Sequence, residues 1–389
     1  MAITILTNPG TYPSAHRPLN FVVSSTNTGV VNFKYVFDVY INGVIVSRVK
    51  IFPETVSGYG IFNAGKIVRN YLATYFKPST TQTVFNYTGT DISVSYDVKF
   101  GEDYGGTTYT NLATGSYKAY NYFMPVFRNH AINYFQQFQN SWLTNRNLTN
   151  MDAALDEKLF VSFFIPTTDT ITATIQKYNQ DGTVNGSPST GTGFAAQTFT
   201  LLDVSPAAIN TYLGTTFIND TVFKYGVKLN FTGGTSTELI VFVSCNPRQP
   251  ANIIHFMNEL GGIDTFAFRG TNRMNRVIER KQFQQNDFQL SGTSMVEVDS
   301  YKRAGGGFIN YNVMQTMNFS LVSDYLDTTN YSWIRELATS PDVYIEKTGY
   351  FYPITIETND WAEKFMLVDK MQNVTMAAKF YHTINSQQR

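Results

Sequence analysis

One stretch near the N-terminus constrains the fold more than any other feature of the sequence. Apolar side chains alternate from Phe33 to Ile41, Asn42-Gly43 follows, and a second strand-like run continues from Val44 to Ile51. A period of two is typical of a half-buried β-strand. Asn-Gly supplies the two positive φ angles that a type I′ turn needs. The pattern therefore predicts an antiparallel hairpin that ends before Pro53.

Strand and turn signals of this kind recur along the chain, and the composition supports them. The sequence contains 31 Phe and 25 Tyr. Thr, Tyr and Phe favour strands, whereas Asn and Gly favour the turns between them. Further strands are expected at residues 83–87, 92–100, 159–165, 168–178, 222–231, 238–244, 252–256, 265–268, 295–298, 343–346, 350–357 and 374–383, with a turn-rich loop at 101–106. We predict a mainly β fold with a few short helices: β-sandwich-like domains plus an α+β C-terminal unit.

Short helices are predicted at three places. Apolar side chains over residues 67–76 follow helical spacing, with polar residues opposite them. Ser205 precedes Pro206, and Gly214 follows eight residues later, which is the usual order of N-cap, first-turn proline and C-terminal glycine. A third helix is expected over residues 331–338.

Residues 131–143 allow two interpretations. Aromatic side chains lie close to helical spacing, while Asn and Gln fill most other positions and charge is almost absent. An ordinary core-facing helix explains this pattern. The alternative is a helix that contacts another subunit through Phe135, Phe138 and Trp142.

The chain of 389 residues exceeds what one hydrophobic core usually organises. We predict three domains. Residues 1–156 form a β-rich domain with a covering helix, and residues 157–247 form a small β-sandwich or barrel-like domain. Residues 248–389 form the C-terminal α+β domain, and its boundary falls within a segment with two prolines, residues 246–250.

The sequence offers no recognisable catalytic or metal-binding pattern. The four histidines, His16, His130, His255 and His382, have no second His or Cys at the spacing of a zinc site. The phosphate-binding, dinucleotide-binding and nucleophile-elbow patterns do not occur. We therefore expect a protein that is not an enzyme and that uses no cofactor or metal.

A single basic cluster stands out. Arg269, Arg273, Arg276, Arg280 and Lys281 have spacings that would place them on one helix face. Such a face is solvated or salt-bridged in most isolated subunits. In a ring, the cluster would repeat around the axis and attract DNA into the channel without a basic overall charge.

Low charge suggests that much of the surface meets other subunits. Charged residues make up 15% of the chain and the formal net charge is zero. Interfaces deplete Lys, Glu and Asp and enrich aromatic residues. A low-charge β domain that stays monomeric is the alternative. The single Cys245, the lack of a signal-peptide pattern and the lack of a long apolar run predict folding in a cytoplasm, without disulfides or a membrane span.

Several stretches resemble virion proteins of crAss-like phages that infect Bacteroidota. The similar residues are 62–72 (FNAGKIVRNYL), 98–105 (VKFGEDYG), 141–145 (SWLTN), 258–266 (NELGGIDTF) and 333–341 (WIRELATSP). The chain looks like a tail, ring or collar protein of such a phage. The resemblance implies a structural role in a ring between the portal and the tail tip of a short-tailed virion, and it transfers no catalytic or cofactor residues.

These observations lead to one expected function and two alternatives. We expect a virion structural protein that forms a homo-oligomeric ring or hub in the tail or collar. It would assemble in the host cytoplasm, contact other tail and portal-proximal proteins, and line the path of ejected DNA. The first alternative is a receptor-binding tail protein that recognises surface polysaccharide. The second is a depolymerase that cleaves such a polysaccharide.

Overall fold

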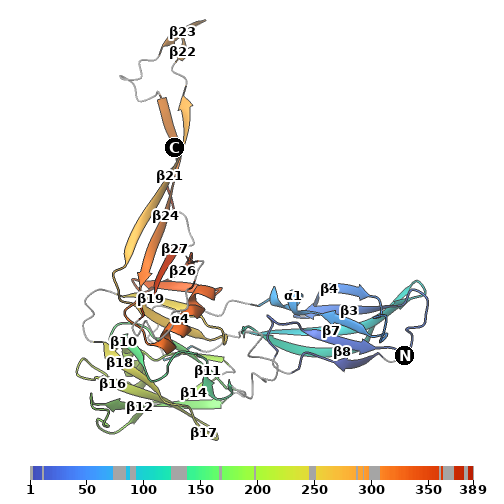
Figure 1. Ribbon diagram of the computed structural model, residues 1–389, viewed down its shortest axis with the longest axis horizontal. Coiled ribbons are helices and arrows are strands. Elements are labelled where there is room, and N and C mark those ends of the chain that lie inside the picture. The colour runs from blue at the N-terminus through green and yellow to red at the C-terminus, as the bar shows by residue number, and fades with distance from the viewer. Residues whose placement is uncertain are drawn as a thin grey trace. The chain divides into compact units, whose positions relative to one another are not determined.

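The computed structural model shows a chain built mainly of strands, which confirms the expected fold class (Figure 1). It describes residues 3–10, 13–72, 85–87, 93–123, 138–165, 169–196, 199–244, 251–285, 288–291, 293–297, 307–358, 361, 372–380 and 384–388. The chain divides into two compact units. The first unit contains residues 1–246, 255–266 and 339–342, and the second contains residues 247–254, 267–338 and 343–389.

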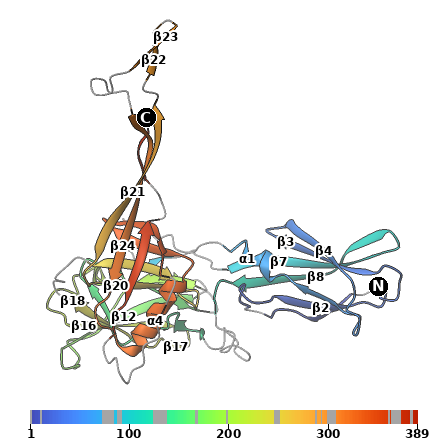
Figure 2. The same ribbon diagram turned by 45° about the horizontal axis from the view of Figure 1, so that its top comes forward.

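The N-terminal part of the first unit is a sandwich of two antiparallel sheets (Figure 2). One sheet has the order β1-β2-β5, formed by Thr4–Thr7, Asn20–Ser24 and Gly60–Asn63. The other has the order β4-β3-β7-β8, formed by Val44–Ile51, Lys34–Ile41, Ser93–Tyr104 and Thr107–Tyr120. Buried aromatic rings fill the space between the sheets: Phe37 stacks on Phe62 with ring centroids 4.9 Å apart.

The predicted hairpin is present as β3 and β4. Asn42 and Gly43 have φ angles of 52° and 77°, as a type I′ turn requires. The predicted loop at 101–106 is shorter than expected. Strand β7 continues to Tyr104, and Gly105 and Gly106 alone form the turn into β8. Two successive glycines with positive φ angles allow that turn without a longer loop.

The predicted helix at 67–76 is shorter and begins earlier. Helix α1 covers Gly65–Arg69. The backbone N–H groups of Asn70, Tyr71 and Leu72 each donate to the carbonyl three residues earlier, so the last turn tightens instead of continuing as an α-helix. Residues 73–76 lie outside the described part of the chain.

A second sandwich completes the first unit. Its larger sheet has the order β10-β18-β16-β12-β13, formed by Met151–Ala154, Leu239–Ser244, Lys224–Phe231, Asp169–Tyr178 and Ser189–Thr190, with β14 (Phe194–Ala196) beside β12 and β17 (Gly234–Thr235) beside β16. Its smaller sheet has the order β6-β15-β11-β9, formed by Asn86–Tyr87, Phe199–Asp203, Phe160–Phe164 and Ser141–Trp142. Buried apolar residues from both sheets form one cluster. The strands predicted at 159–165, 168–178, 222–231 and 238–244 are thereby confirmed.

Helix α3 (Pro206–Leu213) lies against this second core and forms where predicted. The Ser205 hydroxyl accepts a hydrogen bond from the backbone N–H of Ala208. Gly214 ends the helix with a φ of 66°, a left-handed conformation that glycine adopts without strain.

The second unit combines a sheet with one helix. Its strands follow the order β25-β26-β27-β24-β21, formed by Val343–Lys347, Tyr350–Ile356, Thr375–Phe380, Gly307–Val322 and Arg273–Gln285, and β28 (Ile384–Gln388) pairs with β24. A small hairpin joins β22 (Phe288–Ser291) and β23 (Ser294–Glu297). Strands β19 (Asn252–Met257) and β20 (Ile263–Phe268) pass from one unit to the other.

Helix α4 (Thr328–Thr339) covers the segment predicted at 331–338 and extends beyond it at both ends. The Asp327 carboxylate accepts a hydrogen bond from the backbone N–H of Asn330 at 2.7 Å, so Asp327 caps the first turn. The capping residue thus explains why the helix begins three residues before its apolar pattern does.

Candidate functional site

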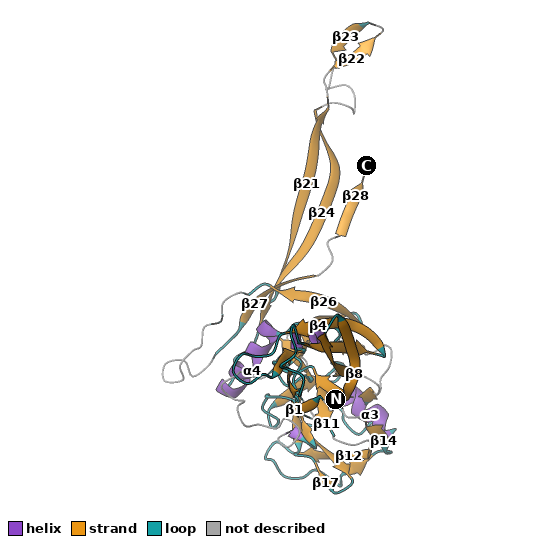
Figure 3. Ribbon diagram, turned by 90° about the vertical axis from the view of Figure 1, so that its right-hand side faces the viewer, coloured by secondary structure: helices purple, strands orange, loops and turns teal. Residues whose placement is uncertain are grey.

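Two long strands of the second unit extend from the rest of the sheet as a ribbon (Figure 3). We call β21 together with the residues of β24 that pair with it the interaction arm. The pairing is antiparallel and runs from Arg273 opposite Ser320 to Gln285 opposite Gly307, with a bulge between Lys281 and Gln282. Thirteen residues at about 3.4 Å each give β21 a length of roughly 40 Å.

The composition of β24 explains why this ribbon forms. Its sixteen residues include no proline and no charged side chain, and seven of them are Phe, Ile, Tyr, Val or Thr. Such a run has high strand propensity and can template a partner that is less strand-like. Near the base of the arm, β24 also pairs with β27, which ties the ribbon to the sheet of the second unit.

The side chains of the outer strand are open to solvent. All twelve from Arg273 to Gln284 are exposed. Six large apolar side chains of the arm are among the exposed residues: Met274, Val277, Ile278, Phe283, Phe308 and Tyr311. Because side chains alternate along a strand, Val277 and Phe283 lie on one face, and Met274 and Ile278 lie on the other. The arm therefore presents apolar groups on both faces.

The arm also has an open edge. Strand β21 ends the strand order of its sheet, so among the described strands it pairs with β24 alone. The backbone N–H and C=O groups on its outer side are available to another strand. Long exposed edges are usually shortened, covered or interrupted in soluble proteins because they template pairing. The structure thus shows a 13-residue edge that no described strand covers, although it carries charged side chains and its pairing has one bulge.

The predicted basic cluster lies on this arm, but the prediction that it lines one helix face was wrong. Arg273 to Lys281 belong to a strand, so Arg276 and Arg280 point to one face and Arg273 and Lys281 to the other. Arg269 precedes the strand. Pairing with β24 overrides the local helical spacing, because secondary-structure propensity is weak beside tertiary contacts.

The three aromatic residues proposed for an interface have different environments. Trp142 is 4% exposed, lies in β9 and packs edge-on against Phe163 with ring centroids 5.3 Å apart. Its indole N–H donates to the backbone carbonyl of Thr237 at 2.8 Å. Trp142 is therefore a core residue of the first unit and lies in a short strand, whereas residues 131–137 of the expected helix lie outside the described part of the chain. Phe138 is partly buried, and Phe135 lies outside the described residues.

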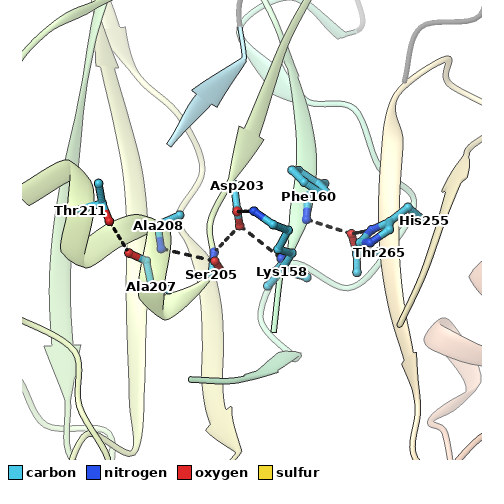
Figure 4. A network of polar contacts seen from close by, with 10 residues as sticks. Lys158, Phe160, Asp203, Ser205, Ala207, Ala208, Thr211, His255 and Thr265 are labelled. Carbon is cyan, nitrogen blue, oxygen red and sulfur yellow. Dashed lines mark hydrogen bonds and ion pairs between the residues drawn. The ribbon is translucent and has the colours of Figure 1, made fainter. Parts of the chain in front are cut away.

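A buried polar network crosses the second sandwich (Figure 4). The Asp203 carboxylate accepts hydrogen bonds from the backbone N–H groups of Leu159 and Ser205, and the Lys158 ammonium lies 3.4 Å from it. Burial raises the pKa of Asp203 above its ordinary value. These contacts join β11, β15 and the start of α3, which indicates a structural role.

Ser205 and His255 in this network do not contact each other. The Ser205 hydroxyl accepts from the first turn of α3, as described above. The His255 ring instead contacts the Thr265 hydroxyl at 2.9 Å and packs edge-on against Phe160. Ser205 and His255 thus have separate partners within the same network.

Among the described residues, no group of three or more His, Cys, Asp or Glu side chains is arranged to hold a metal ion. No helix in the described part is long and apolar enough to cross a membrane. No protein-family model matches the sequence, and no curated protein is significantly similar to it.

Proposed function

We propose that this protein is a non-catalytic structural subunit that assembles with copies of itself through the interaction arm. The observation that carries the proposal is the combination of an open β21 edge with apolar side chains on both faces of a long ribbon. Apart from the short stretch where β28 pairs with β24, the arm is a two-stranded ribbon, and such a ribbon is marginally stable in water by itself. A second copy that pairs along β21 and covers these faces would stabilise the arm.

The magnitudes favour an assembly in which many arms act together. Burying a large apolar side chain completely contributes about 1.5–3 kcal/mol of stabilisation. The six exposed side chains of the arm are already about half covered, so burying the rest of them in an interface would contribute roughly 6 kcal/mol to association. Association costs about 4–15 kcal/mol in lost freedom of motion. Backbone pairing along β21 and closure of a symmetric ring would supply the rest of the free energy needed to offset this cost.

We propose further that the assembly is a ring or hub in the tail or collar of a short-tailed phage. The resemblance of residues 62–72, 98–105 and 333–341 to crAss-like phage virion proteins supports this assignment. Other tail and portal-proximal proteins would be its neighbours. Arg273, Arg276, Arg280 and Lys281 on the arm would repeat around the ring and could meet DNA non-specifically where an arm faces the channel.

The mass of the purified protein tests the proposal. Analytical ultracentrifugation should give an oligomer for the wild type, and Val277→Asp should weaken assembly at least tenfold because an aspartate would have to be buried. Ile278→Asp tests the opposite face in the same way. Val56→Asp is the matched control, since Val56 is 92% exposed in a turn far from the arm in sequence.

Circular dichroism would verify that all three variants keep the strand content of the wild type. A wild type that stays monomeric at every concentration tested contradicts the proposal. So does an oligomer that tolerates both aspartates on the arm as well as it tolerates Val56→Asp. Electron microscopy of the oligomer would then show whether it is a closed ring.

A second candidate function, receptor binding through a saccharide, is supported by a hollow in the second sandwich. Its volume is about 330 Å³, and it is lined by Tyr178, Asn179, Asn185 and the half-exposed Phe223, among others. Aromatic rings beside carboxamides suit stacking and hydrogen bonding to a sugar. Binding to surface polysaccharides on a glycan array, lost in Phe223→Ala, would support this function. Equal signals from both proteins would reject it.

A further inference from the structure

A small cavity lies beside the base of the arm, within the second unit. Its volume is about 280 Å³. Two cationic side chains and two carboxamides contribute to its lining: Arg273, Lys347, Asn252 and Asn272. Apolar side chains that include Phe319, Ile345 and Phe380 complete the lining. The cavity therefore joins a positive region to an apolar one.

The positive region lacks a compensating negative charge. In the part of the chain that the structure describes, neither Arg273 nor Lys347 forms an ion pair. The Lys347 ammonium donates to the Asn252 side-chain oxygen, which fixes its position at the cavity. Lys347 is partly buried, and burial lowers its pKa. Withdrawing a cation from water without a counter-ion is costly, so an anion that enters between the partly buried Lys347 and the exposed Arg273 would be stabilised here.

The walls around these cations are held by contacts within the fold. The Asn272 side chain accepts from the backbone N–H of Val322 at 3.0 Å and donates to the carbonyl of Phe268 at 3.2 Å. The rings of Phe319 and Phe380 lie 5.2 Å apart, and Phe319 is 6% exposed. The cavity is thus largely formed before any ligand arrives, which lowers the entropic cost of binding.

We propose that this cavity binds a carboxylate attached to a small apolar body, such as an apolar amino acid with a free carboxyl group. Arg273 and Lys347 would contact the carboxylate, and Phe319 and Phe380 would contact the apolar part. The volume lies at the lower limit of ligand pockets, which span roughly 300–1,000 Å³, so one residue or a molecule of similar size fits it. Inorganic phosphate fits less well because it has no apolar part to match the aromatic wall.

Ligand-observed NMR with the full-length protein tests this assignment. The probe is N-acetyl-L-phenylalanine, and N-acetyl-L-phenylalaninamide is the matched uncharged compound. We expect the acid to bind at least tenfold more tightly than the amide and than inorganic phosphate. Lys347→Gln, which can keep the hydrogen bond to Asn252, should weaken binding of the acid about tenfold. Arg276→Gln, on the same strand as Arg273 but outside the cavity lining, should leave it unchanged.

The outcomes separate this proposal from the assembly proposal. Equal binding of acid and amide, or unchanged binding by Lys347→Gln, overturns the cavity assignment whatever the oligomeric state. Lys347→Gln should sediment as the wild type does, because Lys347 is not on the arm. A short peptide that ends in phenylalanine and binds more tightly than the free acid would identify a protein C-terminus as the ligand. Equal affinities would identify a small free carboxylate.

Discussion

Gly101 allows a sharp test of how the first sandwich is packed. It lies in the inner strand β7, between Phe100 and Glu102, where the pairing with β8 shifts register. A Cβ atom placed on Gly101 would lie 2.2 Å from the Tyr109 carbonyl oxygen and 3.2 Å from the Thr110 Cα. Both neighbours are backbone atoms of β8, so a side-chain rotation cannot relieve the clash. Gly101→Ala must therefore displace one strand from the other.

The expected cost follows from this geometry. Overpacking a well-filled core destabilises by about 1–3 kcal/mol, and a displaced backbone places Gly101→Ala near the upper end, at about 3 kcal/mol. With a denaturant dependence of ~2 kcal/mol per molar urea, the unfolding midpoint of this region should fall by about 1.5 M. Gly29→Ala is the control, because a Cβ there meets nothing within 4 Å; it should change stability by less than about 0.5 kcal/mol.

Urea titration monitored by hydrogen exchange is the appropriate assay. A chain with two compact units need not unfold in a single step, so a signal from the whole molecule would blur the effect. Peptides from β7 and β8 should lose protection in Gly101→Ala, while peptides from the second unit should keep it. Equal protection of β7 in Gly101→Ala and Gly29→Ala would refute the close approach of the two strands.

Three further predictions concern the second sandwich. Tyr225→Phe removes a buried hydroxyl that donates to the Val204 carbonyl at 2.6 Å and should lower the unfolding free energy by about 1–2 kcal/mol in urea titration; no loss would contradict the hydrogen bond. Trp142→Ala should cost about 3–5 kcal/mol and abolish cooperative unfolding of this sandwich in calorimetry, whereas a surface tryptophan would cost almost nothing. Burial raises the pKa of Asp203 above its ordinary value of 3.8, so the unfolding free energy should fall as pH rises from about 3.8 through the pKa of the native state. Asp203→Asn should flatten that part of the curve of urea midpoint against pH. Identical curves for the wild type and the variant would contradict the raised pKa.

Sequence reasoning identified the basic residues of the candidate site but not their arrangement. The spacing of Arg273, Arg276 and Arg280 fits a helix, and the prediction placed them on one face. The missed signal lies in residues 307–322, a run with no proline or charge and frequent Phe, Ile, Tyr and Val. Read as a strand, that run would have required a partner, and residues 273–285 are the segment with which it pairs.

Some elements could be predicted from the sequence alone because particular turn or capping residues mark their ends. Asn42-Gly43 specifies its turn because both residues tolerate positive φ angles, and Ser205 with Gly214 bounds α3 through caps made within the helix. The tertiary structure decided that Trp142 is a core residue and that 273–285 is an exposed edge strand. Those outcomes depend on Thr237 and on β24, which lie far away along the chain. Spacing within a short window cannot reveal such partners, because burial and strand pairing arise only when distant segments meet.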